Sequence, residues 1–246
     1  MKGLRPWLLM ALALLCAGAS ASEPVFLFSY QQKPPYVVDE ARGEGLYFDL
    51  ARLLSQRLPE HEFVVRQIPR KRLDYLLAKD ELPGLVLGVS PQWFADAQRH
   101  RWSLPFIEDA NLLLSRRSGP ASRLSVATLD GHRLGLISGH HYPALQATLH
   151  RGRVQREDAA SEGANLERLV RGWLDATVVG EKTLEFYLAR QPAWREQLFV
   201  AEPVLSSYQR QLLVPQRHAA LLPALDAVLV GLPEDAEWQG LLARYR

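Results

Sequence analysis

The sequence predicts an α/β protein of two lobes, with the second lobe inserted into the first. Short runs rich in β-branched and aromatic residues alternate with helical stretches, which is typical of α/β sheets. The alternation is interrupted near Gly119 and then starts again, which indicates a second block. The two closing helices most simply pack back on the first block. We therefore assign residues 22–115 and 208–246 to lobe 1 and residues 116–207 to lobe 2.

The first block is expected to open with a strand at 25–30. A loop follows as far as Gly45, because two prolines and two glycines punctuate it. Leucines at helical spacing then predict a helix at 46–58, which ends at Pro59. The remaining elements of this block are a strand at 62–68, a short helix at 72–78, a buried strand at 84–89 and a strand at 111–115.

The second block repeats this alternation. A strand at 132–138 ends at Gly139, and a helix at 162–171 ends at Gly172, since glycine punctuates regular structure. The other elements, in chain order, are a helix at 142–150, a short strand at 154–156, a strand at 174–179, a helix at 181–189, a strand at 207–215, and helices at 218–230 and 235–245.

The N-terminal segment predicts export. A basic start precedes an apolar run at 7–17, and the small residues at 19–21 form a cleavage site. The run is well short of the ~20 residues that a membrane-spanning helix needs. Lipid attachment at Cys16 is disfavoured because Leu15, which is not small, precedes it. We expect removal of residues 1–21, leaving a soluble periplasmic chain that starts near Ser22.

The composition excludes several classes of chemistry. The chain has one cysteine, Cys16, so the processed protein would contain no disulfide, no cysteine zinc site and no cysteine nucleophile. Two of the 29 lysines and arginines lie in the leader, so the processed chain would have 27 basic and 27 acidic residues. This neutral balance does not indicate nucleic acid binding. We expect no cofactor, and a monomer.

Three pairs of motifs occur in a fixed order along the chain. They are Pro34-Pro35-Tyr36 with Gly45-Leu46-Tyr47-Phe48-Asp49-Leu50, Gly88-Val89-Ser90 with Trp102-Ser103-Leu104-Pro105-Phe106, and residues 129–139 with Gly172-Trp173-Leu174-Asp175-Ala176. In order and spacing they resemble the bacterial extracellular solute-binding proteins of family 3, the polar amino-acid branch of periplasmic binding proteins. The resemblance covers nearly all of the chain after the leader.

The resemblance implies a fold and a function. Two α/β lobes would be joined by hinge strands near Asn111–Arg116 and Gln211–Pro215, and the ligand would lie in the cleft between them. The implied function is capture of a small polar or zwitterionic, amino-acid-like solute for an ABC-type transporter, whose membrane permease would be the partner. No catalytic residue is implied by this function.

The resemblance also implies contacts from lobe 1. Tyr36 would place an aromatic face against the ligand, and Tyr30 is a weaker candidate of the same kind. Ser90, at the end of a strand, would hold a carboxylate with its hydroxyl. Alternatively, Tyr36 packs the preceding prolines and Ser90 is a turn residue before Pro91.

An arginine in this region would form a two-pronged pair with the ligand carboxylate. We select Arg99, although neither Arg99 nor Arg101 lies at the family's usual distance from the following motif. Arg70 and Arg72 are alternatives, and a solvated basic face is the simpler interpretation for both.

In lobe 2, Ser138, His140 and His141 join a strand to the start of a helix, where unpaired N–H groups attract anions. The paired histidines could bind ligand and respond to pH. No third ligand at a recognisable spacing supports a metal site, so we predict none. Either histidine could instead be a capping or surface residue.

The largest departure from the family is at Gly180, where amino-acid binders carry an acid for the ligand ammonium. Glu181 stands beside it and is the candidate substitute, although it could simply favour the helix macrodipole. The departure places an α-amino acid ligand in doubt.

Two other functions stay open. The family includes cyclohexadienyl dehydratases, in which case Glu181 or a cleft histidine could act as a general acid. No paired carboxylates or nucleophile–base spacing supports an enzyme. The other alternative is an orphan sensory binding protein.

Overall fold

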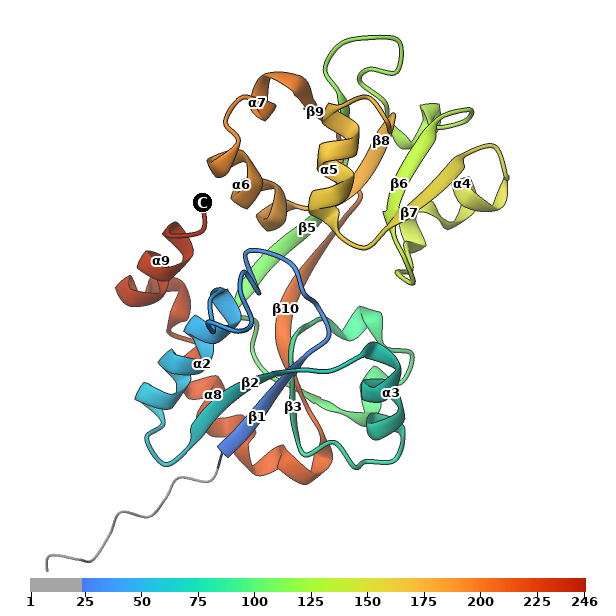
Figure 1. Ribbon diagram of the computed structural model, residues 1–246. Helices are drawn as coiled ribbons and strands as arrows, with labels where there is room; N and C mark the ends of the chain where they lie inside the picture. Colours follow the sequence, from blue (N-terminus) through green and yellow to red (C-terminus); the bar gives the residue numbers. More distant parts are fainter. Residues whose placement is uncertain (1–23) are drawn as a thin grey trace, which may run out of the picture.

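The computed structural model describes residues 24–246 and confirms the two-lobed α/β fold (Figure 1). The predicted leader at 1–21 and its cleavage site lie outside the described residues. No helix in the described part of the chain is long and apolar enough to span a membrane.

Lobe 1 is built on three parallel strands in the order β2-β1-β3. Helices α2 and α3 connect these strands in sequence, and α8 and α9 return from the end of the chain to pack with α2. The bounds are β1 Pro24–Ser29, α2 Leu46–Arg57, β2 Glu62–Gln67, α3 Arg70–Ala78, β3 Gly84–Val89, β4 Arg101–Trp102, α8 Leu222–Leu229 and α9 Ala236–Ala243.

Lobe 2 has its own strands in the order β8-β6-β7, which are parallel to one another. Helix α5 packs on this sheet, and β9 adds to the edge of β5. The bounds are β6 Arg133–Ile137, α4 Gln146–His150, β7 Gln155–Ala159, α5 Glu162–Val170, β8 Ala176–Gly180, α6 Glu181–Arg190, α7 Trp194–Gln197 and β9 Leu198–Val200.

Two long antiparallel strands link the lobes, β5 at Ile107–Arg116 and β10 at Ser206–Val214 (Figure 1). They pair with each other over residues 107–111 and 206–210. Beyond this segment β5 continues into the lobe 2 sheet and β10 into the lobe 1 sheet. The inter-lobe pairing thus starts a few residues before the expected hinge segments. The exact lobe boundaries stay a prediction.

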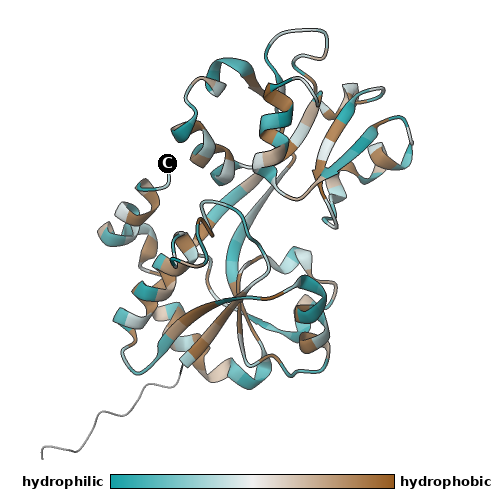
Figure 2. Ribbon diagram, viewed as in Figure 1, coloured by the Kyte–Doolittle hydropathy of each residue, from teal (hydrophilic) through white to brown (hydrophobic). Residues whose placement is uncertain are grey.

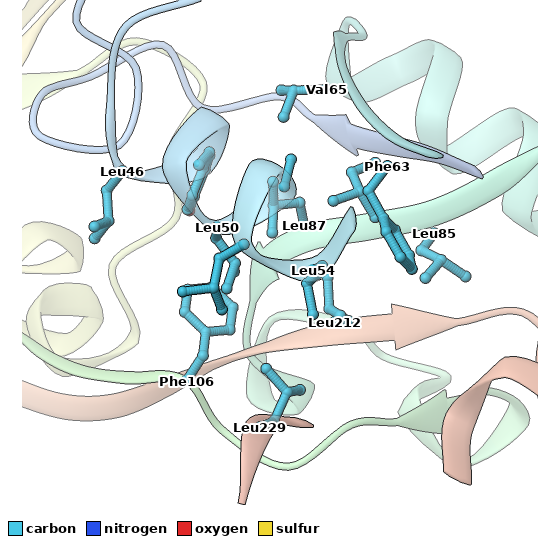
Figure 3. Packing of buried hydrophobic residues seen from close by; sticks show 14 of the residues in the cluster. Leu46, Leu50, Leu54, Phe63, Val65, Leu85, Leu87, Phe106, Leu212 and Leu229 are labelled. Atoms are coloured by element: carbon cyan, nitrogen blue, oxygen red, sulfur yellow. The ribbon is translucent and has the colours of Figure 1, made fainter. Parts of the chain in front are cut away.

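Each lobe has separate apolar cores. In the largest, Leu54 of α2, Leu87 of β3 and Leu212 of β10 pack together (Figure 3). The apolar residues of α2 fall on one face, which is why this helix covers the sheet. Apolar colouring marks strands such as β1 and β3, whereas β5 and β10 are polar where they link the lobes, and the outer helices show both colours (Figure 2).

Most expected elements lie within a few residues of their predicted positions. The helix expected at 142–150 is the main correction, because Pro143 begins a 3-10 turn and the α-helix starts at Gln146. Pro143 fits the first turn of a helix but lacks the N–H that a longer α-helix would use. The short elements β4, α7 and β9 were not predicted, since segments of two to four residues carry little periodicity.

Candidate functional site

A buried ion pair lies where the lobes join. Asp109 on β5 and Arg210 on β10 have 0% exposed side chains, and Arg210 Nη2 donates to Asp109 Oδ2 over 2.8 Å. Because the two strands are antiparallel neighbours, both side chains reach the same face of the hinge. Burial of either charge alone would be costly, so each depends on the other.

Aromatic side chains surround this pair. The hydroxyls of Tyr36 and Tyr208 donate to Asp109 Oδ2 over 2.7 and 2.9 Å. The Arg210 guanidinium lies 3.9 Å from the centre of the Tyr36 ring and 5.6 Å from that of Trp93. These distances are those of cation–π contacts. Arg210 of the protein itself therefore stacks on the Tyr36 ring, which the sequence analysis expected to contact a ligand.

Gly88, near the end of β3, makes this arrangement possible. Its carbonyl accepts from Arg210 Nη1 over 2.9 Å and from the Tyr47 hydroxyl over 3.2 Å. Its φ is 72°, and a Cβ there would lie 1.7 Å from the Tyr47 oxygen. Glycine is therefore required by both the backbone and the close approach.

The charges at this junction shift one another's titration. Burial alone would raise the pKa of Asp109, but the positive charges of Arg210 and Lys33 together lower that pKa to about 2. Burial raises the pKa of Tyr36 well above its usual range and that of Tyr47 to about 12. At neutral pH the site thus holds a carboxylate, a guanidinium and neutral tyrosines.

A second ion pair connects the lobes directly. Lys33, in the loop after β1, places Nζ 2.6 Å from Glu162 Oε1 at the start of α5. Glu162 Oε2 also accepts from the Gly180 N–H over 3.0 Å. Next to this pair, the Thr183 hydroxyl of α6 donates to the Pro34 carbonyl over 2.7 Å. Lobe 1 is therefore bonded to the starts of two lobe 2 helices.

The residues of lobe 1 that were predicted to bind a ligand differ in their exposure to solvent. Tyr36 has no exposed surface, and Ser90 is also buried. Arg99 is 62% exposed and lies 3.6 Å from Asp96 within its own short turn. The structure thus brings Tyr36 to the hinge and leaves Arg99 on the surface. Their roles in binding stay predictions.

The residues of lobe 2 that were predicted to bind a ligand lie in the turn after β6 and at the first residue of α6. Ser138, His140 and His141 are exposed in the turn after β6. Although His140 has exposed surface, partial desolvation of its ring lowers its pKa, the charges of Lys33 and Arg70 lower it further, and Glu162 opposes them. Glu181 is 43% exposed and lies 3.5 Å from Lys182 of its own helix. Their ligand-binding roles also stay predictions.

Sequence reasoning missed Lys33, Asp109, Glu162 and Arg210. Asp109 and Arg210 gave no distinct signal, because Asp109 follows Glu108 and Arg210 lies between Gln209 and Gln211 in polar parts of their strands. Lys33 and Glu162 gave no signal of pairing either, because 129 positions separate them. Among residues 24–246, no group of three or more His, Cys, Asp and Glu is positioned to hold a metal ion.

Comparison with known proteins shows the fold. The ligand-binding core of GluR0 from Nostoc punctiforme, in complex with L-glutamate, superposes with a TM-score of 0.69 at 17% identity over 90% of this chain and 99% of that one. An ancestral arginine-binding protein bound to arginine gives 0.70 at 14% identity over 90% and 97%. The periplasmic VFT2 domain of Bordetella pertussis BvgS gives 0.65 at 16% identity over 100% of both chains.

No protein-family model matches the sequence, and no curated protein matches it either. At these identities the structural similarity shows the two-lobed fold of ligand-binding proteins and does not identify a ligand.

Proposed function

We propose that this protein is a periplasmic solute-binding protein that captures a small polar molecule and delivers it to an ABC-type transporter. The observation that carries the proposal is the pair of α/β lobes joined by the antiparallel strands β5 and β10. Such a hinge lets two lobes close over a solute. The similarity to proteins solved with glutamate and arginine supports a ligand of amino-acid size.

The charges favour a ligand whose main polar group is an anion. Asp109 is paired with Arg210, and Glu162 with Lys33, so both buried acids near Gly180 already have cations. A ligand ammonium placed there would lack a partner and carry a desolvation cost of several kcal/mol. We propose that a carboxylate or aromatic acid binds instead, held by Arg99 or the turn at His140.

We further propose binding without turnover. The charged groups at the hinge, Asp109 and Arg210, are fully buried and paired with each other, so neither can reach a substrate proton. A sensory role without transport is the second candidate, and one observation favours it. The Lys33–Glu162 pair joins the lobes using only the protein's own side chains.

A thermal-shift screen tests the function. The processed chain is heated with separate sets of amino acids, polyamines, organic acids and short peptides, and the recovered compound is then analysed. A compound that raises Tm and is recovered intact supports a binding protein. A stabilising compound that is consumed indicates an enzyme, and stabilisation by none of the sets contradicts a solute-binding function.

A further inference from the structure

We propose that Lys33 is a built-in ligand of the cleft: its ammonium occupies a cation site on lobe 2 and holds the lobes together without an external solute. The inference rests on the proposed binding function and concerns how that same cleft is regulated.

The Lys33 ammonium lies in a formed site. The side chains of Lys33 and Glu162 are 14% and 8% exposed, and their charged atoms are 2.6 Å apart. Glu162 is fixed by its second oxygen, which accepts from the Gly180 N–H over 3.0 Å. A buried carboxylate oriented by a backbone donor is a strong acceptor for an ammonium group. Glu162 thus holds Lys33 as it would hold a bound cation.

Gly180 leaves the space that the ammonium fills. A Cβ on Gly180 would lie 3.0 Å from Lys33 Nζ and 3.6 Å from Asp109 Oδ2. The φ of Gly180 is −64°, which any residue can adopt, so the backbone does not require glycine there. The absence of a side chain instead makes room for Lys33. The ammonium is therefore close to Asp109 as well as to Glu162.

The loop that carries Lys33 is also fixed at its next residue. The Pro34 carbonyl accepts from Thr183 of α6 over 2.7 Å, and Thr183 is fully buried. Two adjacent residues of lobe 1 thus bind the starts of α5 and α6. A third inter-lobe pair, Arg246 with Glu185, is longer at 3.8 Å and more exposed. The contacts at Lys33 and Pro34 are consequently the stronger link.

Two consequences follow for the cleft. An external cation can reach Glu162 only by displacing a tethered competitor, whose local concentration is always high. In addition, the closed arrangement is populated without a solute, so a solute that binds between the lobes adds to an existing closure. The protein thereby differs from a binding protein that closes only on its ligand.

A distance measurement between the lobes tests the proposal. The single cysteine, Cys16, is replaced by serine in the chain expressed with its own leader, and labels are attached to Ala78→Cys in α3 and Ala147→Cys in α4, which are exposed helix positions on different lobes. Lys33→Met removes the charge and keeps the side-chain length. We expect about a tenfold rise in the ratio of open to closed molecules in this variant.

The control is Lys182→Met, because Lys182 is 17% exposed and its carboxylate partners are in its own helix. It should leave the distance distribution unchanged. Lys33→Ala provides a second experiment. Added n-propylammonium replaces the removed atoms and should restore the inter-lobe distance of the closed form. The same compound should have no effect on the unaltered protein.

The proposal is overturned if Lys33→Met and the unaltered protein give the same distribution, or if n-propylammonium does not close Lys33→Ala. These outcomes are separate from the solute screen. If a solute stabilises the protein but Lys33→Met does not change the inter-lobe distance, the binding function is supported and the role of Lys33 as a built-in ligand is overturned. If Lys33→Met opens the lobes but no solute stabilises the protein, the role of Lys33 is supported and the solute-binding function is contradicted.

Discussion

Asp109 and Arg210 face each other across the two hinge strands, with 2.8 Å between Oδ2 and Nη2 and no solvent exposure of either side chain. Each lobe continues one of these strands into its own sheet, so the pair is shared by the whole molecule. Together with the Lys33–Glu162 pair, it places two internal ion pairs at the junction between the lobes. This relationship leads to the predictions below.

Removal of one member of the hinge pair should be strongly destabilising. Arg210→Met leaves Asp109 buried without its cation, and we expect a loss of about 3–5 kcal/mol in the free energy of unfolding. The double variant Asp109→Asn/Arg210→Met should lose less than the sum of the single variants, since the two residues are coupled. Urea denaturation measures this. The exposed pair Arg156–Asp158 provides a control in Arg156→Met, which should change the stability little. Additive losses would contradict the coupling.

Asp109 should also make the free energy of unfolding depend on pH in the acid range. Its pKa in the folded protein is about 2, below the usual 3.8. Because the folded pKa is lowered, its contribution is complete above pH ~4 and is lost as the pH falls from ~4 to ~2. The unaltered protein should therefore lose roughly 2 kcal/mol more over this window than Asp109→Asn/Arg210→Met. Parallel curves in urea denaturation at successive pH values would exclude this role.

The sequence was sufficient for the fold but not for the centre of the site. Alternating apolar runs located most strands and helices, because burial of one face imposes a local period. The hinge pair is different, since Asp109 and Arg210 are 101 positions apart and each lies among other polar residues of its strand. The ligand-binding role of Tyr36 stays a prediction. The structure adds a contact that a local motif does not reveal, because the Tyr36 ring lies against Arg210 from the other end of the chain.

Gly88 should not tolerate a side chain. Gly88→Ala combines a positive φ with a Cβ that would lie 1.7 Å from the Tyr47 hydroxyl oxygen. Backbone strain and overpacking together should cost about 2–5 kcal/mol. Gly119→Ala is the matched control, because φ is also positive there but no atom lies within 4 Å of the added Cβ. It should cost only about 1 kcal/mol. Equal losses for the two variants in chemical denaturation would show that the Tyr47 contact is unimportant.

His140 should report on the Lys33 charge. Partial desolvation of the ring lowers the pKa of His140, and the positive charge of Lys33 contributes to the same shift. Lys33→Met should therefore raise this pKa, as measured by NMR titration of the imidazole ring protons. Lys182→Met removes a lysine that does not shift His140 and should leave the titration unchanged. An unchanged pKa in Lys33→Met would place Lys33 too far from the turn after β6 to influence it.

Calorimetry with matched pairs of ligands measures directly whether the protein prefers carboxylic acids to amino acids: each amino acid is compared with the carboxylic acid that has the same side chain but no α-ammonium group. Since Glu162 and Asp109 already hold internal cations, a ligand ammonium would lack a partner at Gly180. We predict that a carboxylic acid binds and that its amino-acid counterpart binds at least tenfold more weakly, a difference of about 1.4 kcal/mol. Micromolar binding of an amino acid in preference to its counterpart, abolished by Glu181→Gln, would contradict the account and show that Glu181 supplies the missing acid.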